Sequence, residues 1–223
     1  MSITIGVFDF FSYAIPGSLY LLTAIYLLAA FQITTINLQN VELTGSLIVV
    51  FGLAGYMTGI VFDAIAKLIL ERVLKADNVQ VRALEEFENR NSEIKVRFTA
   101  DDWPVLLAYI KHNSPENVFM IEKDKAVSIM LRNTSFCCLV FSVGQLASLL
   151  VVSFSYWQLG LGIAAIIVSI LSAKRSSRFD RWFFLGIYES AVSLGPEMSN
   201  LIGEKRSKDS RPVVLVPRPR RRF

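Results

Sequence analysis

Residues 133–173 read NTSFCCLVFSVGQLASLLVVSFSYWQLGLGIAAIIVSILSA, a stretch of 41 residues without one Asp, Glu, Lys or Arg. As a single helix it would be about 60 Å long, twice the thickness of the hydrocarbon core of a bilayer. It must therefore fold back, and the sequence SFSYWQLG at residues 153–160 is the predicted turn. Tyr156 and Trp157 favour this place because amphipathic rings prefer the membrane interface. The stretch predicts two transmembrane helices, at residues 133–154 and 158–173.

Two more uncharged stretches precede it, with 32 residues between Asp9 and Glu42 and 20 between Glu42 and Asp63. Since about 20 apolar residues can cross a bilayer as a helix, each stretch predicts one span, at residues 15–33 and 45–66. A signal peptide is the alternative for the first span. We do not expect one, because the preceding residues include no Lys or Arg and no small-residue cleavage pattern follows. The predicted fold class is an all-α polytopic membrane protein with four transmembrane helices.

Lys and Arg near the ends of the spans predict the orientation of the chain. Segments 34–42 and 155–159, which join paired spans, contain neither residue type. The opposite side is rich in both, so it is expected to face the cytoplasm, together with both termini, in a cell inner membrane. The basic residues on that side are Lys67, Arg72, Lys75, Lys123, Lys125, Arg132, Lys174, Arg175, Arg178 and Arg181.

Helical patterns continue beyond three of the four spans. Residues 64–88 contain no Gly or Pro, which favours a second span that continues straight into the cytoplasm. We therefore expect the second, third and fourth helices to extend into a cytoplasmic helical bundle, with the last helix ending at Gly195-Pro196. The predicted divisions are spans one and two at 1–66, a cytoplasmic helical insert at 67–132, spans three and four at 133–173, a helical extension at 174–203 and a basic disordered tail at 204–223.

Two helix start signals stand inside the insert, after a break expected around residues 89–98. Thr99-Ala-Asp-Asp102 has the form of a capping box, with Asp in place of the commoner Glu or Gln, and predicts a short helix to about Lys111. Ser114-Pro115-Glu116 combines an N-cap serine, a proline at the first helical position and an acid in the first turn. A long helix is expected from Pro115 into the third span.

Basic residues gather after the fourth span and again at the end of the chain. Residues 174–223 contain 12 basic and 5 acidic residues. We expect a solvated tail on the positively charged inner side, with binding of these basic groups to the anionic inner leaflet or to a protein partner as the alternatives. Nucleic acid is a disfavoured partner. The residues concerned are Lys174, Arg175, Arg178, Arg181, Arg218, Arg220, Arg221 and Arg222.

The residue inventory predicts neither an enzyme nor a cofactor. His112 is the only histidine, and Cys137 and Cys138 lie within a span, so a conventional zinc site cannot be assembled. Phosphate-binding loops and nucleophile elbows are absent from the sequence. No ionisable residue stands in the middle of a span, which disfavours a pump or an ion-coupled transporter. We expect no catalytic, metal-binding or cofactor-binding residues.

Small residues recur at four-residue spacing within the spans, and Gly55-x-x-x-Gly59 matches a motif that lets helix backbones touch. Such contacts can form within one four-helix bundle or between copies of the chain. Gln145 is expected to hydrogen-bond to another helix, with a pore-lining role as the alternative. The predicted packing or oligomer interface contains Gly52, Gly55, Gly59, Gly144, Gln145, Ser148, Ala165 and Ser169.

The opening FDFFSYAIPGSLYLL, at residues 8–22, resembles the start of small bacterial inner-membrane proteins. The order of two spans, a charged cytoplasmic insert, two spans and a basic end is also similar to theirs. Some four-span proteins of this size belong to phage-defence systems, and the membrane subunit of Kiwa is one example. The resemblance implies a role in defence or exclusion and carries over no functional residue.

Three functions are compatible with the sequence. The favoured one is a non-enzymatic membrane sensor, effector or adaptor that binds a cytoplasmic protein. The second is a channel or pore-forming subunit that acts as a homo-oligomer through its small residues. The third is a lipid-modifying enzyme, which would need polar groups at the inner interface but has no nucleophile or metal set to accompany them. Those polar groups would be Asp63, Arg132, Asn133, Arg175 and Arg178.

Overall fold

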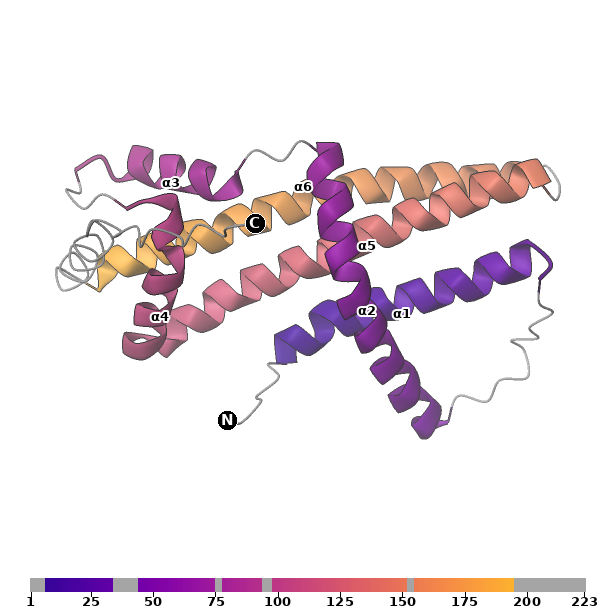
Figure 1. The fold of residues 1–223 in the computed structure, drawn as a ribbon, viewed down its shortest axis with the longest axis horizontal. Helices are drawn as coiled ribbons and strands as arrows, with labels where there is room; N and C mark the ends of the chain where they lie inside the picture. The colour runs from indigo at the N-terminus through magenta and orange to yellow at the C-terminus, as the bar shows by residue number, and fades with distance from the viewer. Residues whose placement is uncertain (1–6, 34–43, 75–77, 94–97, 152–154, 195–223) are drawn as a thin grey trace, which may run out of the picture.

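The computed structural model describes residues 7–33, 44–74, 78–93, 98–151 and 155–194 (Figure 1). Every regular element within these ranges is helical. Four of the helices, α1, α2, α5 and α6, are long and apolar enough to cross a membrane, which confirms the predicted all-α class and the number of candidate spans. The elements are α1 (Val7–Ala30), α2 (Gly45–Leu74), α3 (Val79–Arg90), a 3-10 turn (Ala100–Asp102), α4 (Trp103–Asn113), α5 (Pro115–Val151) and α6 (Tyr156–Ser193).

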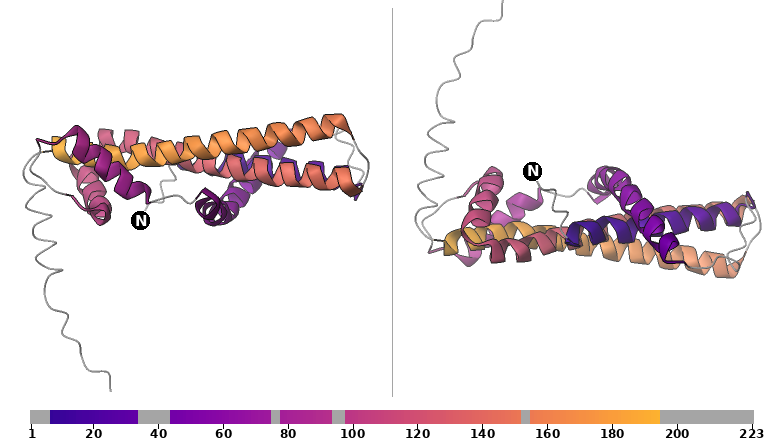
Figure 2. Two further views of the ribbon diagram at one scale, coloured as in Figure 1. Left: turned by 90° about the horizontal axis from the view of Figure 1, so that it is seen from above. Right: turned by 90° about the horizontal axis from the view of Figure 1, so that it is seen from below.

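Helices α5 and α6 form an antiparallel hairpin that sets the long axis of the molecule (Figures 1 and 2). They contain 37 and 38 residues, so each is about 55 Å long and exceeds the roughly 30 Å hydrocarbon core. The first begins at Pro115, as the start signal predicted. The second ends at Ser193, two residues before the glycine that was expected to stop it. Both helices therefore continue well past their uncharged segments.

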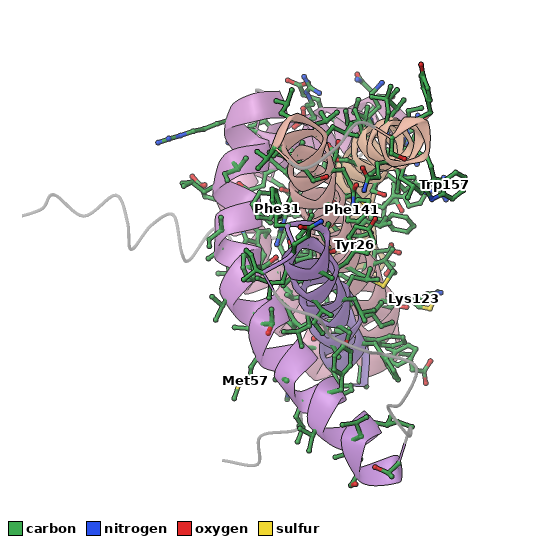
Figure 3. All side chains as sticks on the ribbon, turned by 90° about the vertical axis from the view of Figure 1, so that its right-hand side faces the viewer. Tyr26, Phe31, Met57, Lys123, Phe141 and Trp157 are labelled. Carbon is green, nitrogen blue, oxygen red and sulfur yellow. The ribbon has the colours of Figure 1, made fainter. Side chains whose placement is uncertain are left out.

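Helix α1 lies along α5, and the rings of Tyr26 and Phe141 meet with centroids 5.4 Å apart (Figure 3). Helix α2 is different, because its axis crosses those of α1 and α5 steeply (Figure 1). Its Met57 points away from the other helices (Figure 3). The inclination is steeper than is usual between membrane helices. The contact of α2 with α1 is therefore concentrated where the two axes cross.

Helices α3 and α4 pack against the far ends of α5 and α6, and we call this assembly the terminal bundle (Figure 1). Its core is aromatic and aliphatic, and the rings of Phe98 and Tyr188 stack with centroids 5.8 Å apart. Ion pairs join its outer surface, including Lys125–Asp180 at 2.8 Å. The buried members of the core are Ala83, Phe87, Phe98, Leu106, Ile110, Val118, Ile121, Phe183, Phe184, Leu185, Ile187, Tyr188 and Ala191.

The predicted continuous helix over residues 64–88 is wrong. Helix α2 ends at Leu74, and α3 begins at Val79 after Asn78, whose backbone is not helical (φ −54°, ψ 100°). Asparagine favours the N-cap position because its side chain competes with helical hydrogen bonding. None of the residues in the core of the terminal bundle comes from α2. Helix α2 therefore lies outside the core of the terminal bundle, whereas the ends of α5 and α6 supply residues to it.

The capping box is confirmed, and it stands at the start of the 3-10 turn that leads into α4. The backbone N–H and the hydroxyl of Thr99 donate to Asp102 Oδ2 over 2.8 and 2.7 Å. Pro104 fits in the first turn of α4, where a backbone N–H has no helical acceptor. The break after α3 also falls where polarity predicted it, since that helix ends at Arg90.

Candidate functional site

A row of buried serines joins α5 to α6, and we call Ser128, Ser135, Ser142, Ser169 and Ser176 the serine seam. Ser128 and Ser176 each donate to the backbone carbonyl of the other, over 3.1 and 2.9 Å. Ser135 and Ser169 repeat this exchange at 2.8 Å in both directions. Ser142 donates to the carbonyl of Gly162 over 2.9 Å. The seam thus links serine side chains of one helix to backbone carbonyls of the other along the hairpin.

The three levels of the seam are separated by seven residues in both helices. Seven residues are almost two helical turns, so each level returns to the same face. Small side chains allow close approach of the helices, and their hydroxyl groups find acceptors without an inserted water molecule. Of these serines, only Ser169 belongs to the four-residue spacing of small residues that predicted packing positions. A search for serine or glycine at seven-residue spacing would have found the others.

A second group of polar residues ties α1, α2 and α5 together, and we call Tyr20, Asp63, Arg132 and Asn133 the boundary node. The guanidinium of Arg132 donates to Asp63 Oδ1 over 2.7 Å, and the Asn133 amide donates to the same oxygen over 3.1 Å. The hydroxyl of Tyr20 donates to the backbone carbonyl of Asn133 over 2.9 Å. The side chains of Arg132 and Asp63 are only 12% and 19% exposed, so water screens their ion pair weakly.

The register of the hairpin gives the position of the boundary node. Arg132, four residues after Ser128, lies level with residue 172, four residues before Ser176. The uncharged segment of α6 ends one residue further on, at Ala173. The boundary node therefore lies at the height where the uncharged segments of α5 and α6 end. Asp63 thus pairs with Arg132 of α5 rather than with Lys67, which lies one turn further along α2.

Glycines allow α2 to cross α1 without side chains between them. A Cβ atom added to Gly17 would lie 1.7 Å from the Gly55 carbonyl oxygen, and one added to Gly59 would lie 2.1 Å from the Tyr13 carbonyl oxygen. Both distances are far inside van der Waals contact. Gly52 differs, since a Cβ atom there would meet nothing within 4 Å. Gly55 and Gly59 thus face α1 of the same chain, and Gly52 does not.

The other predicted packing residues have separate surroundings. A Cβ atom on Gly144 would meet the Leu27 side chain of α1 at 2.6 Å. Ser148 is buried and donates to the carbonyl of Gln145 in its own helix over 2.8 Å. Gln145 is fully buried, and its side-chain amide forms no hydrogen bond with any described residue, so the expected interhelical bond is not found among them. Ala165 is half-buried on α6.

The basic residues after the fourth span divide into two kinds. Lys174, Arg175 and Arg178 are exposed, and the Arg175 guanidinium lies 5.4 Å from the ring centre of Phe179. Arg181 instead forms an ion pair with Glu86 of α3, with Nε and Oε2 3.2 Å apart at an angle outside hydrogen-bond geometry. This ion pair joins α6 to α3 on the surface of the terminal bundle. The predicted residues Arg218, Arg220, Arg221 and Arg222 lie outside the described residues.

Of the polar residues that an enzyme would need together, the structure unites Asp63, Arg132 and Asn133. Arg175 and Arg178 are not part of that group. Within the residues that the structure describes, no group of three His, Cys, Asp or Glu side chains is placed to hold a metal ion.

Comparison of the chain with protein-family models, curated proteins and solved structures gives no match.

Proposed function

We propose that this chain is a non-enzymatic inner-membrane sensor or adaptor whose terminal bundle binds a cytoplasmic protein. The observation that carries the proposal is the continuity of α5 and α6 from their uncharged segments into the terminal bundle. The serine seam joins them within the span, at Ser142 and Gly162, and beyond it, at Ser128 and Ser176. A displacement of the hairpin inside the membrane would therefore move the terminal bundle with it.

The boundary node supports the same function from the other two spans. Asp63 belongs to α2 and Arg132 to α5, so their ion pair links a shift of α2 to the hairpin. Tyr20 adds α1 to this link through the Asn133 carbonyl. Coupling between sites requires an element that both can bias, and the hairpin is such an element. In this proposal, α1 and α2 receive the membrane signal and the terminal bundle delivers it.

A cytoplasmic position of the terminal bundle is supported by the distribution of Lys and Arg, which are concentrated on that side of the spans. The architecture resembles membrane subunits of phage-defence systems, and we place the partner in such a system on that resemblance. The oligomeric channel is less favoured, because α1 of the same chain already packs against Gly55 and Gly59. These glycines are therefore not available for contact with a second copy of the chain.

Affinity capture of the full chain from its native membrane in mild detergent tests the proposal, with mass spectrometry and a native size. We expect one soluble protein in a fixed ratio to the chain. Capture with residues 204–223 deleted then separates binding by the tail from binding by the terminal bundle. A homo-oligomer without any enriched soluble protein would contradict the adaptor function, and conductance of liposomes that contain this oligomer would then establish a channel.

A further inference from the structure

One face of α6 points away from the serine seam and carries a regular series of exposed side chains. Ser169 and Ser176 turn toward α5. On the opposite side of the helix, Ile163, Ile167 and Leu171 follow one another at four-residue steps and are 49%, 53% and 61% exposed. Such a series forms a straight apolar stripe. Because it belongs to a candidate span, lipid chains are its natural surroundings.

Cations continue this stripe at the next turns of the same helix face. Lys174 and Arg178 follow Leu171 at steps of three and four residues, and Arg175 lies beside them. None of the three has an ion-pair partner among the described residues. The nearest acid along the helix, Asp180, is paired with Lys125 of α5 at 2.8 Å. The positive charge of this face is therefore not neutralised by the part of the chain that is described.

The spacing along α6 matches the dimensions of a phospholipid leaflet. Trp157, 75% exposed, precedes Lys174 by 17 residues, or about 26 Å of helix, close to the thickness of a hydrocarbon core. Ile163 and Leu171 are about 12 Å apart, most of the depth of one leaflet. An acyl chain that lies on the apolar stripe would therefore place its phosphate at the height of Lys174 and Arg178.

We propose that this face of α6 binds an anionic phospholipid of the cytoplasmic leaflet, with its phosphate held by Lys174, Arg175 and Arg178 and its acyl chain on Ile163, Ile167 and Leu171. A soluble phosphate would use the cations alone and would not explain why they continue a lipid-exposed stripe. The Arg175 guanidinium lies over the ring of Phe179, 5.4 Å from its centre, and a planar guanidinium suits the bidentate recognition of a phosphate.

Nanodiscs of phosphatidylcholine with a minor fraction of phosphatidylglycerol test the proposal. The phosphatidylglycerol that stays bound is counted by native mass spectrometry for the full chain and for the triple variant Lys174→Gln, Arg175→Gln, Arg178→Gln. The natural chain should retain phosphatidylglycerol preferentially. Each removed cation should lower the binding constant about fivefold, since a basic side chain near an anionic surface contributes about that factor. The three single variants give the same information if the triple variant cannot be purified.

Two variants serve as controls. Arg82→Gln, Arg90→Gln and Lys111→Gln together remove the same charge from exposed positions on α3 and α4, and should leave the preference unchanged. The double variant Lys174→Arg with Arg178→Lys keeps the positive charge and should keep the preference for phosphatidylglycerol. Equal retention by the triple variant and the natural chain would overturn the proposal, as would an equal loss in the α3 and α4 control. Inorganic phosphate that raises the melting temperature in detergent as much as phosphatidylglycerol would also overturn it, in favour of a soluble ligand.

Discussion

Arg132 donates to Asp63 over 2.7 Å, although the two residues are 69 positions apart in sequence. The contact joins α5 to α2 at the height where the uncharged segments end. Asp63→Ala should lower the free energy of unfolding by about 3–5 kcal/mol, because it leaves a largely buried guanidinium without its counter-charge. The midpoint of denaturant unfolding in mild detergent, followed by circular dichroism, measures this loss.

The matched control removes both charges, as Asp63→Leu with Arg132→Met. Replacing a buried ion pair by apolar residues of similar volume is often neutral or stabilising. The double variant should therefore be more stable than Asp63→Ala. A double variant that unfolds earlier than Asp63→Ala would show that the ion pair is not what the single change disrupts.

The crossing of α1 and α2 predicts a large difference between two glycine substitutions. Gly17→Ala should destabilise the chain by about 1–3 kcal/mol, because the new methyl group would overlap the Gly55 carbonyl and push the helices apart. Gly52→Ala adds the same methyl group to open space and should not destabilise it. Melting temperatures in one detergent compare them, and equal values would refute the close crossing.

The serine seam can be tested by cross-linking. The hydroxyl oxygens of Ser128 and Ser176 are 3.1 Å apart, so sulfur atoms at these positions need only a small shift to form a disulfide. Ser128→Cys with Ser176→Cys should oxidise readily, and mass spectrometry of the linked peptides detects the bond. Ser128→Cys with Ser177→Cys places the second thiol on an exposed face and should not. Efficient linkage of the second pair would contradict the register.

The substitution Tyr188→Phe should not reduce the stability of the terminal bundle. The ring of Tyr188 packs against those of Phe87 and Phe98 with centroids 5.9 and 5.8 Å away. Its hydroxyl is buried without a hydrogen-bond partner among the described residues, and burial raises the pKa of this phenol to about 12, with smaller contributions from Asp102 and Asp101. Tyr188→Phe should therefore leave stability unchanged or raise it by up to about 1 kcal/mol.

Tyr188→Ala is the contrasting change, since it removes the ring as well and should cost about 3–5 kcal/mol. Chemical unfolding of the two variants separates the ring from the hydroxyl. A loss in Tyr188→Phe as large as that in Tyr188→Ala would mean that the hydroxyl has a partner and would refute the prediction.

The orientation and the spanning of α2 can be tested with single cysteines at exposed positions on either side. Thr44→Cys and Trp157→Cys should react with a membrane-impermeant maleimide in intact cells, because the orientation expected from the distribution of Lys and Arg puts both on the outer side. Arg72→Cys and Asn113→Cys should react only after the membrane is opened. Reaction of residues 44 and 72 from the same side would show that the steeply inclined α2 does not cross the membrane.

The sequence predicts those features of the fold that are encoded locally. Uncharged length predicts the four candidate spans, and the cap residues at Thr99 and Ser114 predict where α4 and α5 begin. These signals act within a few residues, through backbone hydrogen bonds or the cost of placing charge in lipid. The same reasoning failed between α2 and α3, because the apolar period continues past Leu74 while Asn78 interrupts the backbone.

The boundary node could not be predicted in the same way. The sequence offers Lys67 as the partner of Asp63 one turn away, and only the relative register of α2 and α5 brings Arg132 closer. That register depends on the glycine crossing and on the serine seam, which are contacts between distant segments. Residues that form contacts between helices can therefore be recognised in the sequence only when they recur at a regular spacing. The serines at seven-residue intervals are such a case.

The seven-residue interval of the serine seam restricts the distance between the membrane and the terminal bundle to certain values. One residue inserted into α5 between Ser128 and Ser135 would rotate the helix by about 100° and turn one serine out of the interface. Seven residues inserted there and seven into the facing part of α6 would restore every pair and lift the bundle by about 10 Å. Longer or shorter stalks between membrane and bundle are thus attainable only in steps of one whole interval.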